Sequence, residues 1–383
     1  MKVPIKILFI SHSSGLYGAE RNLLLLVKNI NKSNFHPIVA LPAGGPLKDE
    51  MLRLNIKTYE IRFPWWVRGN LNIFAILHSF IKEFIALIKL YKIIKEENIA
   101  IVYTNSIVVF SGVLIAFITK RPHIWHIREI LHNNPDLFSL LPDKLLFRFI
   151  SGFSARVVVV SNAVADQFNN RGINSKVRVI YDGIDFEELK VHNSYPTISG
   201  LKKSDWLVGV IGSLQKRKAQ DDAIRAIKIV KETIPDIKLL LVGKGDESFT
   251  NYLKNLVSEL QLTEYVIFTG HRNDVPDILS CCNVLLMTSW AEPLGTVALE
   301  AMALGVPVIG SNSGGLQEII QEGITGFCVP PRNPQEIANK LIDLFLDLDK
   351  VTQMRENSKK IAKQRFSFQL CTQNIESMLV SVE

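Results

Sequence analysis

The feature that most constrains this chain is a regular alternation of short apolar runs with longer helical patterns. In the first half, the runs are residues 5–10, 37–41, 56–61, 100–103, 123–127 and 156–160. A second series follows at residues 207–211, 238–242, 266–269, 284–287, 307–309 and 326–329. Strands that are apolar throughout and alternate with helices are typical of parallel sheets covered on both faces. The pattern predicts an α/β chain of two doubly wound domains in tandem.

A polar stretch without periodicity, residues 186–205, separates the two series and is the expected linker. The predicted domains are therefore residues 1–190 and 205–365, and a helical pattern follows at 366–383. Ligands of doubly wound sheets bind beyond the carboxyl ends of the strands. Two such domains that face each other are expected to hold their ligands in a central cleft.

Composition limits the kinds of partner that the chain is expected to bind. The 383 residues carry a net charge of +7, which favours an acidic partner such as a nucleotide diphosphate or an anionic lipid. Zinc-finger spacing, RNP-like patterns and long arginine runs are missing from the sequence, so we expect no nucleic-acid partner. The four cysteines have no metal-ligand spacing, and no uncharged apolar stretch reaches about 18 residues. We expect a cytoplasmic protein without a membrane span.

Two glutamates stand eight positions apart in the segment from Glu292 to Glu300. Glu292 precedes a Pro and a Gly and is expected on a loop, whereas Glu300 is expected about two turns into the following helix. The first N–H groups of a helix are free to bind anions and hydroxyl oxygens. The two carboxylates are therefore suited to accept hydrogen bonds from two parts of one polar ligand, such as a sugar and a ribose.

Glycine-rich and cationic turns follow several of the predicted strands. Lys216, Arg217 and Lys218 follow the first strand of the second series, where adjacent cations suit a diphosphate. A Gly-Lys-Gly turn at Gly243 allows a close approach of the backbone to a ligand. In the first domain, Gly15 and Gly18 follow the first strand. Their spacing is not that of the dinucleotide fingerprint, which counts against a dehydrogenase.

These segments resemble the retaining glycosyltransferases of family 4, also called glycosyl transferases group 1, which have the GT-B fold of two Rossmann-like domains. The resemblance rests on the paired glutamates, the Gly-Ala-Glu-Arg run from Gly18, the lysine at 218, the Gly-x-Gly turn at Gly243 and Gly305-Val306-Pro307. Three positions depart from the family pattern: Ser213 stands where arginine is common, Ala219 replaces glycine, and Asp182 replaces asparagine.

The resemblance implies a transfer that needs neither a metal nor another cofactor. It assigns catalytic roles to His126, Lys218 and Glu292, with His12, His123 and Arg128 as alternatives or neighbours of His126. It implies a donor site formed by the residues Gly15, Gly18, Ser213, Arg217, Gly243, His271, Arg272, Leu294, Gly295, Thr296 and Glu300. It also implies that the last helix, 366–383, packs back on the N-terminal domain.

The expected function is therefore retaining transfer of a sugar from a nucleotide-diphosphate sugar to a hydroxyl of a glycan or lipid-linked acceptor, in polysaccharide or glycoconjugate synthesis. Two alternatives remain open at this point. One is a nucleotide-sugar 2-epimerase, which shares the architecture. The other is a subunit that binds nucleotide sugars without turnover, for which the missing arginine at Ser213 is the argument.

Residues 61–95 form a basic and apolar segment. They include Trp65 and Trp66, then an apolar helical pattern, with six Lys or Arg residues and the single acid Glu83. Such a helix is suited to an anionic membrane surface. The alternative is a core helix with lysines on its outer face. The first interpretation predicts a peripheral protein on the inner face of the membrane.

Overall fold

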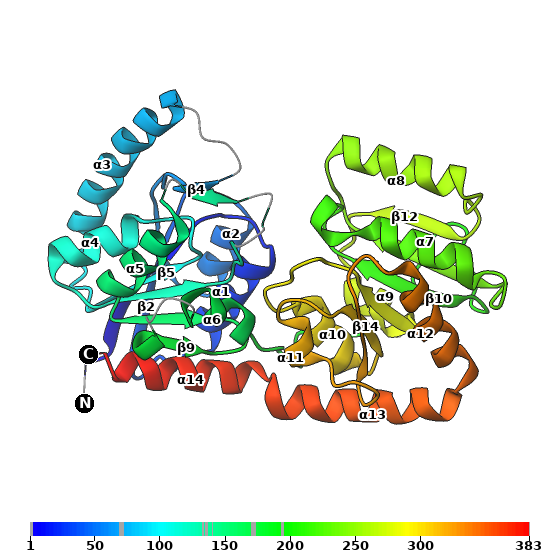
Figure 1. Cartoon of the computed structure of the whole chain (residues 1–383). Helices are drawn as coiled ribbons and strands as arrows, with labels where there is room; N and C mark the ends of the chain where they lie inside the picture. Colours follow the sequence, from blue (N-terminus) through cyan, green and yellow to red (C-terminus); the bar gives the residue numbers. More distant parts are fainter. Residues whose placement is uncertain are drawn as a thin grey trace. The chain divides into compact units, whose positions relative to one another are not determined.

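The chain folds into two compact units. The structure, a computed structural model, describes residues 3–68, 73–131, 134, 137–139, 141–169, 174–192 and 195–382. Unit 1 comprises Met1–Asp182 together with Phe368–Glu383, and unit 2 comprises Gly183–Ser367. Both units contain a parallel sheet with helices connecting its strands (Figure 1).

Unit 1 is built on a seven-stranded sheet in the order β3-β2-β1-β5-β6-β8-β9, in which all neighbouring strands run parallel. Its strands are β1 (Ile5–Ser11), β2 (Phe35–Leu41), β3 (Lys57–Glu60), β5 (Ile101–Asn105), β6 (His123–Ile127), β8 (Arg156–Val159) and β9 (Val177–Val179). A short antiparallel pair, β4 (Val67–Arg68) and β7 (Phe138–Ser139), lies outside this sheet. The strand order reverses between β1 and β5, which are adjacent although the chain forms two other strands of this sheet, β2 and β3, between them.

The helices of unit 1 cover the apolar faces of that sheet. They are α1 (Gly18–Asn29), α2 (Pro46–Arg53), α3 (Ile73–Glu96), α4 (Ser111–Thr119), α5 (Asp143–Phe153), α6 (Asn162–Asn169) and α14 (Phe368–Val380), with a 3-10 turn at Asn174–Lys176. Helix α14 buries Phe368, Cys371, Ile375 and Leu379, spaced three or four residues apart, in the core that α1 also lines. The Glu376 carboxylate accepts a hydrogen bond of 2.7 Å from the backbone N–H of Asn31, which places the last helix within unit 1.

Unit 2 repeats the architecture with six parallel strands in the order β12-β11-β10-β13-β14-β15. The strands are β10 (Trp206–Ile211), β11 (Ile237–Val242), β12 (Val266–Gly270), β13 (Val284–Met287), β14 (Val308–Ser311) and β15 (Gly326–Val329). Its helices are α7 (Gln220–Val230), α8 (Glu247–Glu259), α9 (Val275–Cys281), α10 (Thr296–Leu304), α11 (Leu316–Ile319), α12 (Pro334–Leu346) and α13 (Leu348–Arg365), with a 3-10 turn at Lys216–Lys218.

Local side-chain chemistry fixes where three of these helices begin. The carboxylates of Asp246 and Asp347 and the amide oxygen of Asn333 each accept a hydrogen bond from a backbone N–H in the first turn of α8, α13 and α12, at 2.8, 2.9 and 3.0 Å. These caps satisfy donors that a helix cannot pair internally. Pro334 occupies the first position of α12, where a proline loses no hydrogen bond.

The predicted α/β class with two doubly wound sheets is confirmed. Every expected strand is present, with bounds that differ by at most a few residues. The short strands β4, β7 and β9 were not predicted, because two or three residues are too few to establish a period. Within the described residues, none of the helices combines the length and apolarity needed to cross a bilayer.

Two helical glycines in unit 1 give a test of packing. A Cβ added to Gly112 in α4 would lie 1.9 Å from the Thr104 Oγ1 atom on β5, whereas one added to Gly152 in α5 would meet nothing within 4 Å. We expect Gly112→Ala to destabilise the protein by about 1–3 kcal/mol through overpacking. Gly152→Ala is the matched control and should stabilise it by about 0.5–1 kcal/mol. Urea denaturation of both variants measures this, and equal midpoints would contradict the packing shown here.

Candidate functional site

The carboxyl ends of β10 and β13 form the centre of the site in unit 2. The order of the sheet reverses between these neighbouring strands. The loops that follow the two strands therefore diverge to opposite faces of the sheet and leave room for a ligand between them. The first loop contains Lys218 and the second contains Glu292.

Lys218 and Glu292 form an ion pair across these loops. The Lys218 Nζ atom donates a hydrogen bond of 2.6 Å to the Glu292 Oε2 atom, and the two side chains are only 17% and 13% exposed. Burial alone would raise the pKa of Glu292, but the charge and hydrogen bond of Lys218 and the nearby charge of Arg217 outweigh burial and lower it. Glu292 therefore stays ionised at neutral pH and can accept hydrogen bonds from hydroxyl groups.

Hydrogen bonds to backbone carbonyls hold the two loops together. The Thr288 hydroxyl donates to the Lys218 carbonyl at 2.8 Å, and the Trp290 N–H donates to the Arg217 carbonyl at 2.9 Å. The carbonyl of Glu292 accepts a hydrogen bond of 2.7 Å from the N–H of Gly315 in the turn after β14. These contacts bring together Arg217, Lys218 and Glu292, three of the residues named as site candidates from the sequence.

The turn after β14 requires glycine. Gly314 has a φ of +59°, and a Cβ there would lie 2.2 Å from the Glu292 carbonyl oxygen. A side chain at this position would displace the backbone of Glu292. Gly314 and Gly315 thus allow the turn to pack against the backbone of Glu292 and Pro293, although neither glycine was among the predicted site residues.

Two predicted donor residues, Ser213 and Gly243, follow the first two strands of unit 2, where the backbone packs closely. Gly243, with a φ of +144°, follows β11, and a Cβ there would lie 2.0 Å from the carbonyl oxygen of Gly212. The carbonyl of Ser213 accepts a hydrogen bond of 2.9 Å from the Gln220 side chain in α7. Both residues lie in the turns directly after β10 and β11, beside the loop of Lys218.

The segment after Glu292 leads into α10. Leu294 is buried, Gly295 has a left-handed φ of +96° and precedes the helix, and Thr296 is its first residue. Glu300 is buried within α10 at 6% exposure. Because the helix begins at Thr296, Glu300 lies just over one turn into it and not two turns, as the sequence pattern predicted.

His271 and Arg272 follow β12, the edge strand of the sheet, and are two strands removed from β10. His271 is exposed. The guanidinium of Arg272 donates to both carboxylate oxygens of Asp274, at 2.8 and 2.5 Å. This bidentate pair occupies the arginine, so the predicted stacking of Arg272 on a nucleobase would have to compete with it.

Sequence reasoning missed a second cation near the pair. The guanidinium of Arg332, in the loop after β15, lies 4.2 Å from the ring centroid of Trp290, two residues before Glu292. Arg332 has a φ of +58°, which is uncommon for a residue other than glycine. Its backbone N–H donates to the Asp222 carboxylate, where burial and the charge of Asp221 raise the pKa to about 6. Arg332 was not named from the sequence, because neither its positive φ nor its contact with Trp290 can be read from a sequence.

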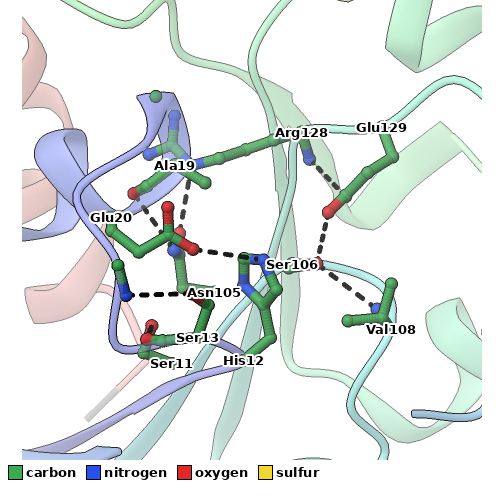
Figure 2. A network of polar contacts seen from close by, with 12 residues as sticks. Ser11, His12, Ser13, Ala19, Glu20, Asn105, Ser106, Val108, Arg128 and Glu129 are labelled. Atoms are coloured by element: carbon green, nitrogen blue, oxygen red, sulfur yellow. Dashed lines mark hydrogen bonds and ion pairs between the residues drawn. The ribbon is translucent and has the colours of Figure 1, made fainter. Parts of the chain in front are cut away.

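Unit 1 has its own polar network at the carboxyl ends of β1, β5 and β6 (Figure 2). The His12 Nε2 atom lies 3.2 Å from the carboxylate of Glu20, whose side chain is 2% exposed. Asn105, at the end of β5, donates to the Ala19 carbonyl at 3.2 Å and accepts from the Arg128 Nε atom at 3.0 Å. Arg128 also pairs with Asp182 in the interior.

A strained turn is part of the same network. Ser106 has a φ of +91°, and its hydroxyl donates to the Glu129 carboxylate. Glu129 also accepts hydrogen bonds from the backbone N–H groups of Ile107 and Arg128, at 3.2 and 2.9 Å. Strained residues of this kind persist only where the surroundings fix them, and they concentrate at functional sites.

The structure buries His126, the histidine that the resemblance assigns a catalytic role. Its ring is 1% exposed and its Nδ1 atom lies 2.7 Å from the hydroxyl of Tyr103. Burial, together with the charge of Arg128, holds its pKa well below the usual value, so the ring is neutral. His123, the alternative, is buried to the same extent and bonded to Thr104 and Ser154. His12, whose side chain is 16% exposed, is thus the more accessible histidine in this network.

Gly15 and Gly18 lie in the same unit as His12. Gly15 is in the loop between β1 and α1, where its N–H donates to the Ser13 hydroxyl at 3.0 Å. Gly18 is the first residue of α1, and a Cβ there would meet nothing within 4 Å. Among the residues that the structure describes, no cluster of His, Cys, Asp and Glu has the arrangement of a metal site.

The raised pKa of Asp222 gives a prediction about pH. Its folded pKa of about 6 lies above the ordinary 3.8, so the stabilisation from the neutral carboxyl is complete below pH 3.8 and is lost as the pH rises through 6. Asp222→Asn should therefore stabilise the protein at pH 7, by up to about 3 kcal/mol, and the gain should vanish near pH 4. Urea denaturation between pH 4 and 8 measures it, with the exposed Asp236→Asn as control. A gain independent of pH would contradict the assignment.

Two family models match consecutive parts of the chain. "Glycosyltransferase Family 4" matches residues 17–188, and "Glycosyl transferases group 1" matches residues 193–361. The two matches lie in unit 1 and unit 2 except for a few residues at the boundary.

Relatives and solved structures agree with these matches. The chain is 25% identical to N-acetyl-alpha-D-glucosaminyl L-malate synthase of Bacillus anthracis over 96% of its length and 94% of that protein. It is 26% identical to an Escherichia coli UDP-Gal:alpha-D-GlcNAc-diphosphoundecaprenol alpha-1,3-galactosyltransferase over 69% of the chain and 71% of the relative. Anabaena HepE, solved in complex with UDP and with UDP-glucose, superposes with a TM-score of 0.81 at 26% identity, covering 98% of this chain and 100% of HepE. The chain therefore belongs to the GT-B glycosyltransferases of the family 4, group 1 type.

Proposed function

We propose that this chain transfers a sugar, with retention of anomeric configuration, from a nucleotide-diphosphate sugar to a hydroxyl group of a glycan or lipid-linked acceptor. Unit 2 binds the donor, and unit 1 binds the acceptor. The Lys218–Glu292 pair at the β10/β13 switch point is the observation that carries this proposal. Because HepE was solved in complex with UDP-glucose, UDP-glucose is the first donor to test.

The chemistry follows from charge at that pair. As the bond from the sugar C1 to the diphosphate breaks, negative charge grows on the leaving phosphate oxygen. Lys218 and Arg217 stabilise that charge, and fixed cations in a water-poor site do so without reorganisation. The ionised Glu292 accepts hydrogen bonds from the sugar hydroxyls, and Glu300 on α10 binds the ribose diol.

No group of the enzyme forms a bond with the sugar in this proposal. The acceptor oxygen attacks C1 from the face that the diphosphate leaves, and its proton passes to the departing phosphate oxygen. The reaction therefore needs no enzymic nucleophile, metal or other cofactor. It is expected to take place in the cytoplasm, where nucleotide sugars are available.

Turnover of UDP-glucose tests the site. Lys218→Ala and Glu292→Ala should each lower the rate of UDP release by about 10²–10³-fold, because each removes a group that acts on the transition state. Lys340→Ala, which breaks a Lys–Glu pair on α12 in the same unit, is the control and should leave the rate unchanged. EDTA should have no effect, and NMR of the glycoside formed from UDP-α-glucose should show the α anomer.

Other outcomes identify the alternatives. Wild-type rates in both site variants would mean that the site is misplaced, and a β product would exclude retention. An epimerised nucleotide sugar formed without release of UDP would identify an epimerase. Thermal stabilisation by UDP-glucose without any turnover would identify a binding subunit.

We propose further that unit 1 rests on an anionic membrane surface through α3. Seven of its large apolar side chains are 46–66% exposed: Leu77, Phe80, Ile81, Phe84, Ile85, Ile88 and Tyr91. Phe117 and Ile118 of the neighbouring α4 are 66% and 54% exposed. In Figure 1 the beginning of α3 extends beyond the other elements of unit 1. Apolar patches of this extent are typical of interaction sites.

The charges around α3 favour an anionic surface. Lys89, Lys92 and Lys95 are exposed on the helix, and the exposed Glu96 at its end pairs with Lys92 alone among them. Glu83, the only acid of residues 61–95, is instead buried and accepts a hydrogen bond of 2.8 Å from the Trp66 indole. Burial raises the pKa of Glu83, which weakens its charge further. The exposed part of this segment is therefore apolar and basic, as binding to anionic lipid requires.

Vesicle flotation tests the surface. The wild type should float with phosphatidylglycerol vesicles and much less with phosphatidylcholine vesicles. The double substitution Ile81→Glu and Phe84→Glu should abolish flotation, since it places charge in the apolar face. Leu346→Glu, at a 69% exposed position of α12 in unit 2, is the control. Absence of wild-type binding to phosphatidylglycerol would remove the proposal.

A further inference from the structure

Trp65 is an exposed aromatic side chain in a firmly held position. It is 43% exposed, although tryptophan is mostly buried in folded proteins. Its indole Nε1–H donates to the carbonyl of His12 at 3.3 Å, and the two rings lie 5.8 Å apart. The next residue, Trp66, donates its backbone N–H to the Val108 carbonyl at 2.9 Å. The indole is thus presented to solvent with little freedom to move.

The segment that holds Trp66 is itself fixed by the strained turn at Ser106. The Ser106 hydroxyl accepts from the Val108 N–H at 3.4 Å, while the Ser106 carbonyl accepts from the Trp125 indole at 2.9 Å. The turn directly follows β5, at the switch point of the sheet in unit 1. Trp65 therefore stands at the edge of the sheet where ligands of this fold bind.

Polar groups with unused hydrogen-bonding capacity lie beside this indole. The Oε1 atom of Glu20 and the Nδ1 atom of His12 are buried and have no hydrogen-bond partner among the described residues. The Glu20 Oε1 atom lies 3.2 Å from His12 Nε2 in an ion pair, outside hydrogen-bond geometry. Buried groups of this kind are normally satisfied, so a ligand or water is needed to complete them.

An exposed aromatic face next to unsatisfied acceptors and donors matches the chemistry of a sugar. A pyranose ring has an apolar face of C–H groups that packs on an aromatic ring, and hydroxyls at its edge that bond to carboxylates and imidazoles. The negative charge of Glu20 disfavours a phosphate or carboxylate ligand at the same place. The site is therefore suited to a neutral pyranose.

We propose that unit 1 binds a neutral pyranose of the acceptor on the Trp65 indole, with a hydroxyl of that sugar hydrogen-bonded to the His12–Glu20 pair. This rests on the proposed transferase function and names the class of its acceptor. The subsite is joined to α3, because the Trp66 ring packs on Phe80 at 5.0 Å and its indole bonds to Glu83. A sugar carried on a lipid would place its glycan at Trp65 and its lipid near α3.

Saturation-transfer NMR on the full chain with bound UDP tests the subsite. The probes are the methyl pyranosides of glucose, galactose and N-acetylglucosamine, with glucose 1-phosphate as the anionic comparison. We expect at least one neutral pyranoside to bind, and glucose 1-phosphate to bind more weakly. Trp65→Ala should weaken that binding roughly five- to tenfold, whereas Trp65→Phe should keep most of it. Tyr252→Ala, in unit 2 and also 43% exposed, is the matched control.

Two results would overturn the proposal: no pyranoside binds the wild type, or Trp65→Ala binds the pyranoside as the wild type does. If the second result comes with loss of flotation on phosphatidylglycerol vesicles, Trp65 belongs to the lipid surface. UDP-glucose hydrolysis in the same samples separates this from a failure of the proposed function. Hydrolysis by the wild type without pyranoside binding means a fault confined to the subsite, whereas absence of hydrolysis by the wild type means a fault in the proposed function.

Discussion

The ion pair between Lys218 and Glu292 is the interaction on which the donor site depends. It keeps a largely buried carboxylate ionised, and it links the loops after the two strands where the sheet order reverses. A buried charge without its partner is costly, so the pair explains why both loops are tied by additional backbone hydrogen bonds and by the glycine turn at Gly314. The donor chemistry and the fold of unit 2 therefore share the same few contacts.

In unit 1, the polar residues near the switch point between β1 and β5 form a larger network. The centre there is a network of carboxylates, an arginine and strained backbone. His12 is its more accessible histidine, and the buried His126 lies next to Arg128. Arg128 can remain charged in the interior of this network because it has a partner. Burial alone would lower its pKa, but the Asp182 carboxylate compensates and raises it, so the guanidinium stays charged inside the fold. The network fixes the ends of β5 and β6.

Helix α3 illustrates how one residue decides the character of a surface. From the sequence, a basic membrane helix and a core helix with outer lysines were both possible. The structure buries Ala86, Leu90 and Ile94 but exposes Phe84 and Ile88, so the helix has an apolar face on each side. Because Glu83 points inward to Trp66, it does not oppose the lysines on the outside, and the exposed acid Glu96 lies at the last position of the helix, 3.7 Å from Lys92.

The amino-acid pattern alone predicts the strands, their parallel arrangement in two doubly wound sheets, and the loops that carry Lys218 and Glu292. These follow from apolar runs, helix caps and glycine spacing, which act over a few residues. Tertiary structure alone decided that His126 is buried, that Arg332 stacks on Trp290, and that Trp65 is held against His12. Burial and contact depend on residues far apart in the chain, and a local pattern holds no information about which strand, loop or ring will lie opposite.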